Sequence, residues 1–308
     1  MRRLLIVGPG AMGLLFASRL KKLTSHEIFL LDYKKERAEF LNKQGIKVEG
    51  LKGEFHVYVP VITKEQIDFS PDFVLIFVKA YSTKDAAYEL KEIVSEDSCV
   101  ITLQNGIGNI EILEEVLKKK VYGGVTAEGA TLISTGHVRH AGYGDTIIGP
   151  SSDKLTELRD ILNKAGFSTQ IRDDIESFLW GKLLINVGIN ALTAITGLRN
   201  GMLIQIEETK FIMHESLREA MEVVKKKKLK LPYEDPFQKT EEVCKKTAQN
   251  ISSMLQDVLA QRPTEINFLN GAIVKESKKL GIDTPVNQAL TFLIRAIQKT
   301  YKHRVTRR

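Results

Sequence analysis

The sequence predicts an α/β fold, with an N-terminal domain built on a doubly wound, mostly parallel sheet and an all-α C-terminal domain. Up to about residue 171, short apolar runs alternate with helical stretches, as in parallel strands joined by crossover helices. From about residue 173 onward, nearly every segment has helical periodicity. We therefore expect two domains, at residues 1–172 and 173–308.

The chain begins with an apolar run, a glycine-rich turn and a helical segment in direct succession. Residues 3–7 predict a strand, residues 8–13 supply the turn, and residues 14–20 continue with helical spacing. This order indicates a Rossmann-type domain, in which the turn and the helix N-terminus hold the pyrophosphate of a dinucleotide. The predicted cofactor contacts in the turn are Gly8, Pro9, Gly10, Ala11, Met12 and Gly13.

The second predicted strand, residues 27–32, ends at Asp32, about twenty residues beyond the glycines. An acidic residue at this position usually binds the adenosine ribose, which favours NADH because a carboxylate repels a 2′-phosphate. However, Lys34, Lys35 and Arg37 follow closely and would neutralise such a phosphate. Asp32 is alternatively a cap for the helix expected over residues 34–43. These residues leave the choice between NADH and NADPH open.

The alternation of strands and helices continues to the end of the first domain. We expect strands at 57–61, 73–78, 99–103 and 121–125, helices at 82–93 and 109–117, antiparallel strands at the sheet edge within 132–149, and a last helix and strand within 153–171. Lys79 and Asn105 each follow one of these strands. Both are expected to face a ligand cleft beyond the carboxyl ends of the strands, between the domains. The alternatives are a solvated Lys79 and a simple turn at Asn105.

The first predicted helix of the second domain, residues 175–197, is apolar nearly all round, which is typical of a buried helix. Lys182, Asn186 and Asn190 nevertheless recur every four residues and share one face. Burial lowers the pKa of a lysine, so that it exchanges a proton near neutral pH. These residues predict the wall of a polar pocket, unless Lys182 reaches solvent and the asparagines cap loops. Further helices are expected at 203–228, 240–260, 263–279 and 285–302.

Composition excludes several classes of protein. No uninterrupted apolar stretch approaches the ~20 residues of a membrane span, and the N-terminus does not resemble a signal peptide, so we expect a cytoplasmic protein without a membrane partner. Cys99 and Cys244 lack motif spacing, and no Cys/His cluster indicates a metal. The net charge of +7 comes largely from residues 225–228 and the tail, 302–308. Neither run has interleaved aromatic residues, which speaks against nucleic-acid binding.

Together these residues resemble the ketopantoate reductase (2-dehydropantoate 2-reductase) family over essentially the whole chain. The matching motifs lie at residues 8–13, 78–80, 103–106, 180–186 with Asn190, 199–201, 250–257 and 264–266. The resemblance implies NAD(P)H-dependent reduction of the C2 ketone of 2-dehydropantoate to (R)-pantoate, a step towards pantothenate and coenzyme A. The family commonly prefers NADPH, and many members carry a basic residue in place of Asp32.

The resemblance also implies roles for individual residues. Lys182 corresponds to the general acid, and Glu265 to a second essential residue near the nicotinamide ribose and the substrate. Lys79 and Asn105 correspond to positions where cofactor and substrate meet, and Ala130 to a position near the cofactor. The residues implied to hold the keto acid are Asn105, Lys182, Asn186, Asn190, Asn200, Asn250 and Ser253.

Spacing adds two local expectations for the later helices. Asn250 and Ser253, three residues apart, would face one way on a helix, or would alternatively be surface polar residues. Glu265 would lie in the first helical turn after Pro263, where the helix dipole favours a carboxylate. The competing hypotheses are a dehydrogenase for another 2-keto or hydroxy acid, and a non-catalytic dinucleotide sensor. The helical domain would hold the keto acid, and would also form the interface of a possible homodimer.

Overall fold

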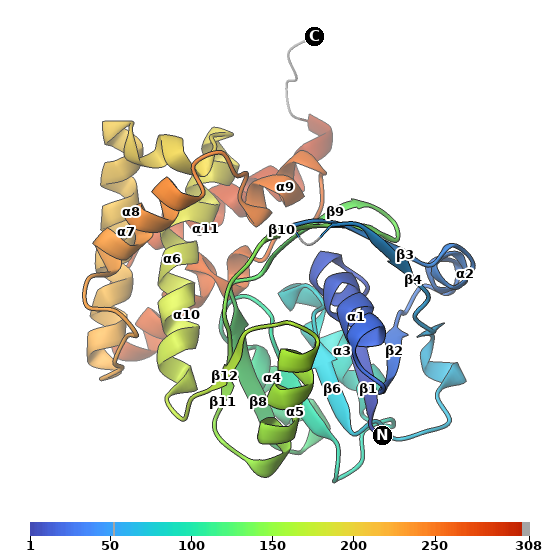
Figure 1. Cartoon of the computed structure of the whole chain (residues 1–308). Coiled ribbons are helices and arrows are strands. Elements are labelled where there is room, and N and C mark those ends of the chain that lie inside the picture. Colours follow the sequence, from blue (N-terminus) through green and yellow to red (C-terminus); the bar gives the residue numbers. More distant parts are fainter. Residues whose placement is uncertain (52, 304–308) are drawn as a thin grey trace. The chain divides into compact units, whose positions relative to one another are not determined.

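The computed structural model describes residues 1–51 and 53–303, so Arg304, Arg307 and Arg308 of the basic tail lie outside the described residues (Figure 1). The chain divides into two compact units. The first contains Met1–Gln104 and Asn109–Ile175, and the second contains Asn105–Gly108 and Glu176–Arg308. The sequence suggested a division after residue 172 and gave no sign that four residues near position 105 group with the helices.

The first unit is built on a sheet that contains eight strands in the described part of the chain, in the order β12-β11-β8-β7-β6-β1-β2-β5. Neighbouring strands run parallel except β11, which pairs antiparallel with β8. This confirms the predicted mostly parallel sheet. The strands are β1 (Arg3–Val7), β2 (Glu27–Leu31), β5 (Val61–Ile62), β6 (Phe73–Ile76), β7 (Cys99–Thr102), β8 (Val121–Thr126), β11 (Thr146–Gly149) and β12 (Thr169–Ile171).

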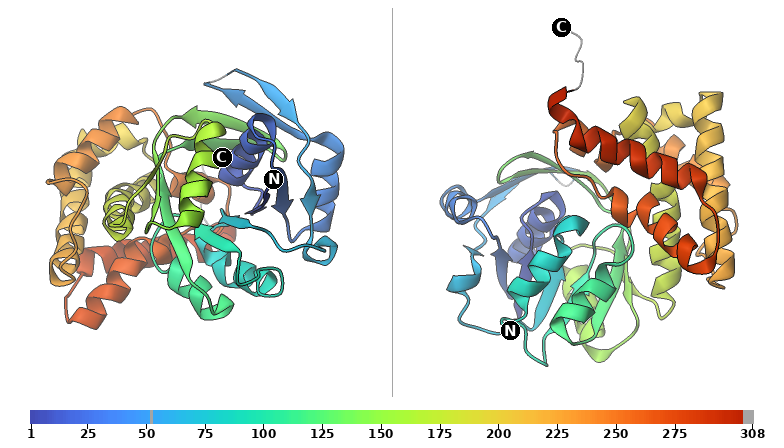
Figure 2. Two further views of the ribbon diagram at one scale, coloured as in Figure 1. Left: turned by 60° about the horizontal axis from the view of Figure 1, so that its bottom comes forward. Right: turned by 180° about the vertical axis from the view of Figure 1, so that it is seen from behind.

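Helices cover both faces of this sheet because successive strand residues point to opposite sides (Figure 2). Leu4 and Ile6 of β1 pack in one core with α1 and α5. Leu5 and Val7 pack in the opposite core with α3 and α4. The helices of this unit are α1 (Ala11–Leu23), α2 (Lys35–Gln44), α3 (Thr83–Leu90), α4 (Asn109–Leu117) and α5 (Asp153–Lys164). The doubly wound arrangement therefore follows from the apolar content of the buried strands.

A second sheet covers the outer side of α1, and within the described residues its strand order is β4-β3-β10-β9. Its strands are β3 (Ile46–Gly50), β4 (Phe55–Val57), β9 (Gly129–Ser134) and β10 (His137–Gly142). The expectation that residues 132–149 lie at the edge of the main sheet is therefore wrong for β9 and β10. The strand expected at 57–61 is also wrong, since β4 and β5 lie in different sheets. Alternation identifies a strand, but it does not identify its partner, and β10 pairs in parallel with the distant β3.

The second unit is organised around α6 (Ile175–Thr196). By length and composition α6 could cross a membrane, yet 67% of its most apolar window is buried within the structure. Leu183, Leu184 and Val187 are buried there in one core with residues of the surrounding helices. These helices are α7 (Glu207–Lys226), α8 (Pro236–Lys246), α9 (Ser253–Leu259), α10 (Asn270–Leu280) and α11 (Pro285–Lys299), with the short 3₁₀ turns η3 (Asn200–Ile204) and η4 (Ile266–Phe268).

Two predicted helices of this unit are interrupted. The stretch 240–260 splits into α8 and α9, because the intervening loop bonds elsewhere: the Asn250 carbonyl accepts from the Asn200 N–H at 3.1 Å. Ser252 then starts α9 as its N-cap, accepting from the Leu255 N–H at 3.1 Å. The stretch 263–279 splits as well, into η4 and α10. Asn250 and Pro263 therefore both lie outside regular helix.

Candidate active site

Two glycines of the turn after β1 are required by the backbone itself. Gly8 has a φ of +102°, and a Cβ there would lie 2.8 Å from Cγ1 of Val78. A Cβ on Gly13 would lie 2.0 Å from the carbonyl oxygen of Gly8. Gly10 differs, because no described atom lies within 4 Å of the position that its Cβ would occupy. The turn is therefore closed on the protein side at Gly8 and Gly13 and open at Gly10.

The open side of the turn coincides with the start of α1. This helix, which the structure describes in full, has Gly10 as its N-cap, no capping side chain and no acidic residue in its first turn. By helix geometry, the N–H groups of Ala11, Met12 and Gly13 have no acceptor within the helix. An uncapped N-terminus with open space at Gly10 fits the pyrophosphate of a dinucleotide.

The carboxylate of Asp32, at the end of β2, is engaged by the chain's own groups. Its side chain has no solvent exposure, and Arg37 binds both oxygens, with Nε 2.5 Å from Oδ2 and Nη2 2.6 Å from Oδ1. Oδ1 also accepts from the Lys34 N–H at 3.0 Å, just before α2. The hydrogen bond to Asp32 raises the pKa of Arg37. The partly exposed guanidinium of Arg37 thus covers Asp32, the residue that the sequence predicted at the ribose. The neighbouring Tyr33 is 67% exposed.

The remaining predicted residues of the first unit lie at the ends of strands or in the second sheet. Lys79 is half-buried in the loop that follows β6. Ala130 lies in β9, opposite His140 of β10. Sequence reasoning placed Gln104 in a motif at the end of a strand without giving it a role, and it missed Thr83. Both are buried beside the Lys79 loop, where Nε2 of Gln104 donates to the Val78 carbonyl and to Oγ1 of Thr83, both at 2.8 Å.

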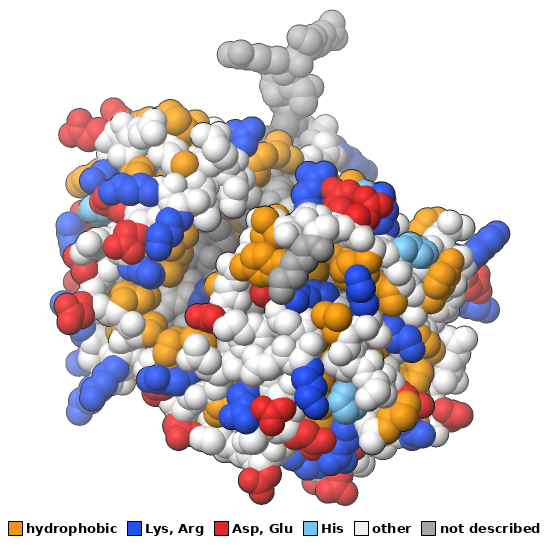
Figure 3. Space-filling view, viewed as in Figure 1, with side chains coloured by type: hydrophobic (Ala, Val, Ile, Leu, Met, Phe, Trp, Pro, Cys, Tyr) orange, Lys and Arg blue, Asp and Glu red, His pale blue; other side chains and the backbone are white. Residues whose placement is uncertain are grey.

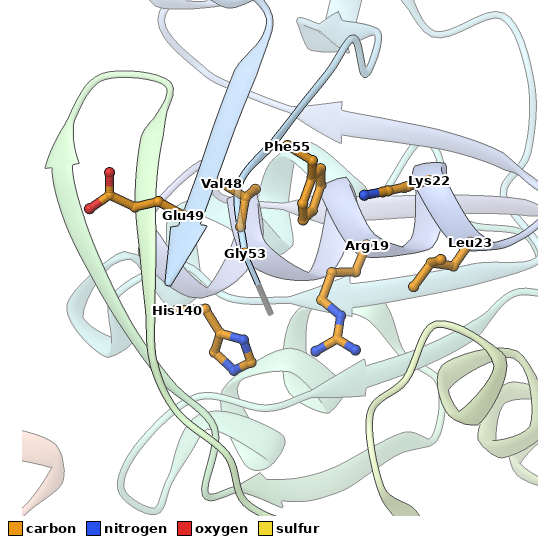
Figure 4. A pocket seen from close by; sticks show the side chains of 8 residues that line it. All are labelled: Arg19, Lys22, Leu23, Val48, Glu49, Gly53, Phe55 and His140. Carbon is orange, nitrogen blue, oxygen red and sulfur yellow. The ribbon is translucent and has the colours of Figure 1, made fainter. Parts of the chain in front are cut away.

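A pocket of about 190 Å³ lies between α1 and the second sheet (Figure 4). Buried Arg19 donates from Nη2 to the Gly166 carbonyl at 2.8 Å, and burial lowers its pKa. His140 is buried with Glu128, whose Oε2 lies 2.5 Å from its Nε2. In Figure 4 the Glu49 carboxylate points away from Arg19 and His140. Among the described residues that line this pocket, none belongs to the predicted site.

In the second unit, the face of α6 that carries Lys182, Asn186 and Asn190 is polar within an apolar helix. Lys182 and Asn186 are half-buried, and Asn190 is buried. Burial lowers the pKa of Lys182 to about 8, and the charge of Glu265 opposes this shift. Glu265 is itself 6% exposed and accepts from Nδ2 of Asn105 at 3.4 Å. The unit therefore brings together a titratable ammonium, a carboxylate and amide groups from three separate segments.

Glu265 reaches this position in a way that the sequence did not indicate. It directly precedes η4 instead of lying in the first turn of an α-helix after Pro263, so that expectation is wrong. Its Asn105 partner comes from the four-residue segment that groups with the helices. The positions of Glu265 and Asn105 depend on packing between distant segments, which a rule about the first turn of a helix cannot predict.

The other predicted substrate residues lie around the loop between α8 and α9. Asn250 is exposed and non-helical, and Ser253 is the first residue of α9, so the shared helix face is wrong. Asn200 donates from Nδ2 to Oγ1 of Thr247 at 2.9 Å, and its buried Oδ1 has no hydrogen-bond partner among the described residues. Sequence reasoning missed Ser252, whose hydroxyl lies 2.6 Å from Oγ1 of Thr193. The available signal was spacing, since Thr193 follows Asn190 by three residues on α6.

Neither metal chemistry nor thiol chemistry is indicated by the described residues. Within residues 1–51 and 53–303, no group of three or more His, Cys, Asp or Glu side chains could hold a metal ion. Burial raises the pKa of Cys99 and of Cys244 to about 11. Basic and acidic side chains are interspersed over the face shown in Figure 3.

Comparison with known proteins agrees with these features. Residues 4–153 match the family model for ketopantoate reductase PanE/ApbA, and residues 174–298 match the model for its C-terminal part. The 2-dehydropantoate 2-reductase of Archaeoglobus fulgidus is 35% identical over 303 residues, covering 96% of this chain and 98% of that protein.

Solved structures give the same result for the fold. A PanE/ApbA family ketopantoate reductase from Ralstonia eutropha JMP134 is 30% identical, with a TM-score of 0.91 and coverage of 98% of this chain and 100% of that one. D-Mandelate dehydrogenase in a ternary structure with NADH and anilino(oxo)acetate is 24% identical, with a TM-score of 0.89 and coverage of 97% and 99%. Since both family models and a relative above 30% identity match along nearly all of its length, the chain belongs to the ketopantoate reductase PanE/ApbA family.

Proposed function

We propose that this chain reduces the C2 ketone of 2-dehydropantoate to pantoate, with a nicotinamide dinucleotide as the hydride donor. Membership of the ketopantoate reductase family supports the reaction. The observation that carries the mechanism is Lys182, a partly buried ammonium whose pKa is lowered to about 8 in a polar cluster with Glu265. When bound, the dinucleotide supplies the hydride.

Lys182 acts as the general acid. A ketone oxygen gains negative charge as C2 is reduced, and an ammonium within hydrogen-bond distance stabilises that charge and donates a proton. A pKa of about 8 leaves most of the lysine protonated at neutral pH while making the proton easier to release than from an exposed lysine. In the reverse direction the neutral amine accepts the proton of the alcohol.

Glu265 and the neighbouring amides position the substrate and the acid. Glu265 favours the charged form of Lys182, since its carboxylate opposes the larger effect of burial on the pKa of the lysine. Asn105 binds Glu265 and offers its amide to the nicotinamide ribose and the keto acid. Asn186, Asn190, Asn250 and Ser253 hold the carboxylate and hydroxyl groups of the substrate. Asn200 supports this set by binding Thr247 and the Asn250 carbonyl.

The dinucleotide binds at the turn of residues 8–13, with its pyrophosphate at Gly10 and the start of α1 and its nicotinamide end towards Lys79 and Ala130. We assign NADPH as the preferred form. Arg37 engages both oxygens of Asp32, so the carboxylate is not offered to a ribose diol. The guanidinium and Lys34 instead present positive charge to a 2′-phosphate. Tyr33 provides an exposed ring beside them.

The reaction is tested by following the absorbance of the reduced nicotinamide with 2-dehydropantoate, using NADPH and NADH in parallel. We expect turnover with 2-dehydropantoate and a higher kcat/KM with NADPH. An aryl 2-keto acid is the comparison substrate, because a structurally similar protein is a mandelate dehydrogenase. Turnover of the aryl acid with none of 2-dehydropantoate would overturn the substrate assignment, and a higher kcat/KM with NADH would overturn the cofactor assignment.

A further inference from the structure

The chain leaves the first unit and returns to it within a very short segment. Gln104 and Asn109 belong to the first unit, whereas the four residues between them, Asn105–Gly108, belong to the second. This crossing segment carries Asn105, which binds Glu265. Contacts that hold the two ends of this segment therefore also affect the position of Asn105 in the site.

Within the second unit, the crossing segment is held against the region around η4. Gly106 has a φ of +81°, and a Cβ there would lie 2.2 Å from the Phe268 carbonyl oxygen. The Ile107 N–H donates to the same carbonyl at 3.2 Å. Together with the Asn105–Glu265 bond, these contacts fix the segment next to the residue that tunes Lys182.

Within the first unit, one hydroxyl joins both ends of the crossing segment. Oγ1 of Thr83 accepts from Nε2 of Gln104 at 2.8 Å, and it lies 2.8 Å from two acceptors, Oδ1 of Asn109 and the Ala80 carbonyl. All three side chains are at least 93% buried. Thr83 thus links the residue at which the chain leaves the first unit to the residue at which it returns.

Gln104 extends the same hydrogen-bond network to the loop after β6, which contains Val78 and Lys79. Its Nε2 also donates to the Val78 carbonyl at 2.8 Å, and its Oε1 accepts from Oγ1 of Thr102 at 2.8 Å. Val78 lies against Gly8, since a Cβ on Gly8 would be 2.9 Å from the Val78 nitrogen. Lys79 follows Val78 directly. The side-chain amide of Gln104 therefore holds two parts of the chain in place: the Val78–Lys79 loop, which borders the glycine turn, and the start of the segment that carries Asn105.

We propose that Gln104 and Thr83 are positioning residues for the reduction, setting together the geometry of the Val78–Lys79 loop and of Asn105. The part of this assignment that concerns Asn105 rests on the proposed function. The part that concerns Val78 rests only on its contact with Gly8 in the glycine turn. Burying three polar side chains costs free energy unless each is hydrogen-bonded, and the completed network in return holds one geometry.

The first test compares Thr83→Val with Thr83→Ser. Valine has the shape of threonine without the hydroxyl, so it removes both links at the ends of the crossing segment, whereas serine keeps them. We expect Thr83→Val to lower kcat at least about tenfold, since about tenfold is the scale of one lost buried hydrogen bond and the variant loses two, with a smaller change in the dinucleotide KM. Thr83→Ser should stay within about fourfold of the wild type, on the scale of a lost buried methyl group. Thermal melts of each variant show whether it is folded.

The second test is Gln104→Glu, with Gln170→Glu on the exposed side of β12 as the matched control. A carboxylate has no hydrogen to donate to the Val78 carbonyl, so the loop beside Gly8 loses its anchor. We expect a dinucleotide Kd about tenfold higher, measured by nicotinamide fluorescence without substrate, and no change in the control.

The outcomes separate this inference from the proposed reaction. Variants that are less stable but keep wild-type kcat, KM and dinucleotide Kd in their folded fraction would make the network purely structural and overturn the inference. If wild type did not turn over 2-dehydropantoate, the proposed reaction would fail, but the Kd of Gln104→Glu would still test the Val78 anchor. An unchanged Kd with normal turnover by Thr83→Val would overturn the positioning role alone.

Discussion

The two units present different kinds of candidate site. In the first unit, the groups suited to binding a dinucleotide are mainly backbone atoms of one turn, residues 8–13. In the second unit, the candidate catalytic groups are side chains from separate segments. The turn needs glycine because a Cβ at Gly8 or Gly13 would collide with the backbone. The cluster of Lys182, Glu265 and Asn105 depends on burial and charge instead. Under the proposed function, cofactor binding would rest on local backbone geometry, and the chemical step would rest on long-range packing.

The comparison predicts that the two functions separate by mutation, and Lys182→Ala should show the largest effect. Loss of the ammonium removes the proposed proton donor and the charge proposed to stabilise the developing oxyanion, so kcat should fall by on the order of 10²–10⁴. Dinucleotide affinity should stay close to wild type, because the glycine turn belongs to the other unit. Steady-state kinetics and fluorescence titration measure the two quantities.

Lys225→Ala, an exposed lysine of α7, is the control for loss of one positive charge from the same unit. It should leave both quantities unchanged. If Lys182→Ala weakened dinucleotide binding as much as it slowed turnover, the proposal that the first unit binds the cofactor and the second carries the proton donor would be wrong.

Arg37→Gln should produce the next largest effect, on the choice of cofactor. The substitution removes the guanidinium proposed to bind a 2′-phosphate and releases the buried carboxylate of Asp32. We expect the ratio of kcat/KM for NADPH to that for NADH to fall by roughly 10-fold to 100-fold, as expected for charge-assisted hydrogen bonds. Lys43→Gln, at an exposed lysine in the last turn of α2, provides a matched loss of charge. An unchanged ratio in Arg37→Gln would place the selecting residue elsewhere.

The same contrast explains how far the sequence could predict the site. The strand, turn and helix around Gly8 are consecutive, so their spacing alone indicates a dinucleotide site. The polar face of α6 is also local, because Lys182, Asn186 and Asn190 recur at helical spacing. Asp32 was found by its position, but its capture by Arg37 depends on a side-chain rotamer that no spacing rule specifies.

The predictions that failed depend on contacts between distant segments. Asn250 was assigned to a helix, yet its carbonyl is bound by the Asn200 N–H, fifty residues earlier, and the helix stops. Glu265 was assigned to a helical turn, but it precedes η4 and receives Asn105 from the crossing segment. The sequence pattern indicates strands within 132–149, but the parallel pairing of β10 with the distant β3 follows only from the fold. Periodicity reports what a segment buries, and it does not report what that segment contacts.

Gly10→Ala, compared with Gly13→Ala, tests whether the turn is open only where a ligand would bind. At Gly10 a methyl group meets no described atom and φ is −81°, so stability should be unchanged, while the dinucleotide KM should rise about tenfold as the backbone is pushed from the pyrophosphate. At Gly13 the Cβ would lie 2.0 Å from the Gly8 oxygen, so unfolding free energy should fall by about 1–3 kcal/mol. Equal destabilisation of both variants would contradict this distinction.

Glu265→Gln removes a charge but keeps a side chain of the same shape, so its effect on kcat at neutral pH should be smaller than that of Lys182→Ala, and its most specific effect should be on the pH profile. Burial lowers the pKa of Lys182 and the Glu265 charge raises it, so a neutral glutamine should leave that pKa below its present value of about 8. Because reduction requires the protonated amine, the decline of kcat/KM on the alkaline side should begin at lower pH in the variant. Glu208→Gln, an exposed carboxylate at the start of α7, should keep the wild-type profile. An alkaline limb that does not move in Glu265→Gln would mean that Glu265 does not set the charge state of Lys182, and that its contribution is confined to holding Asn105.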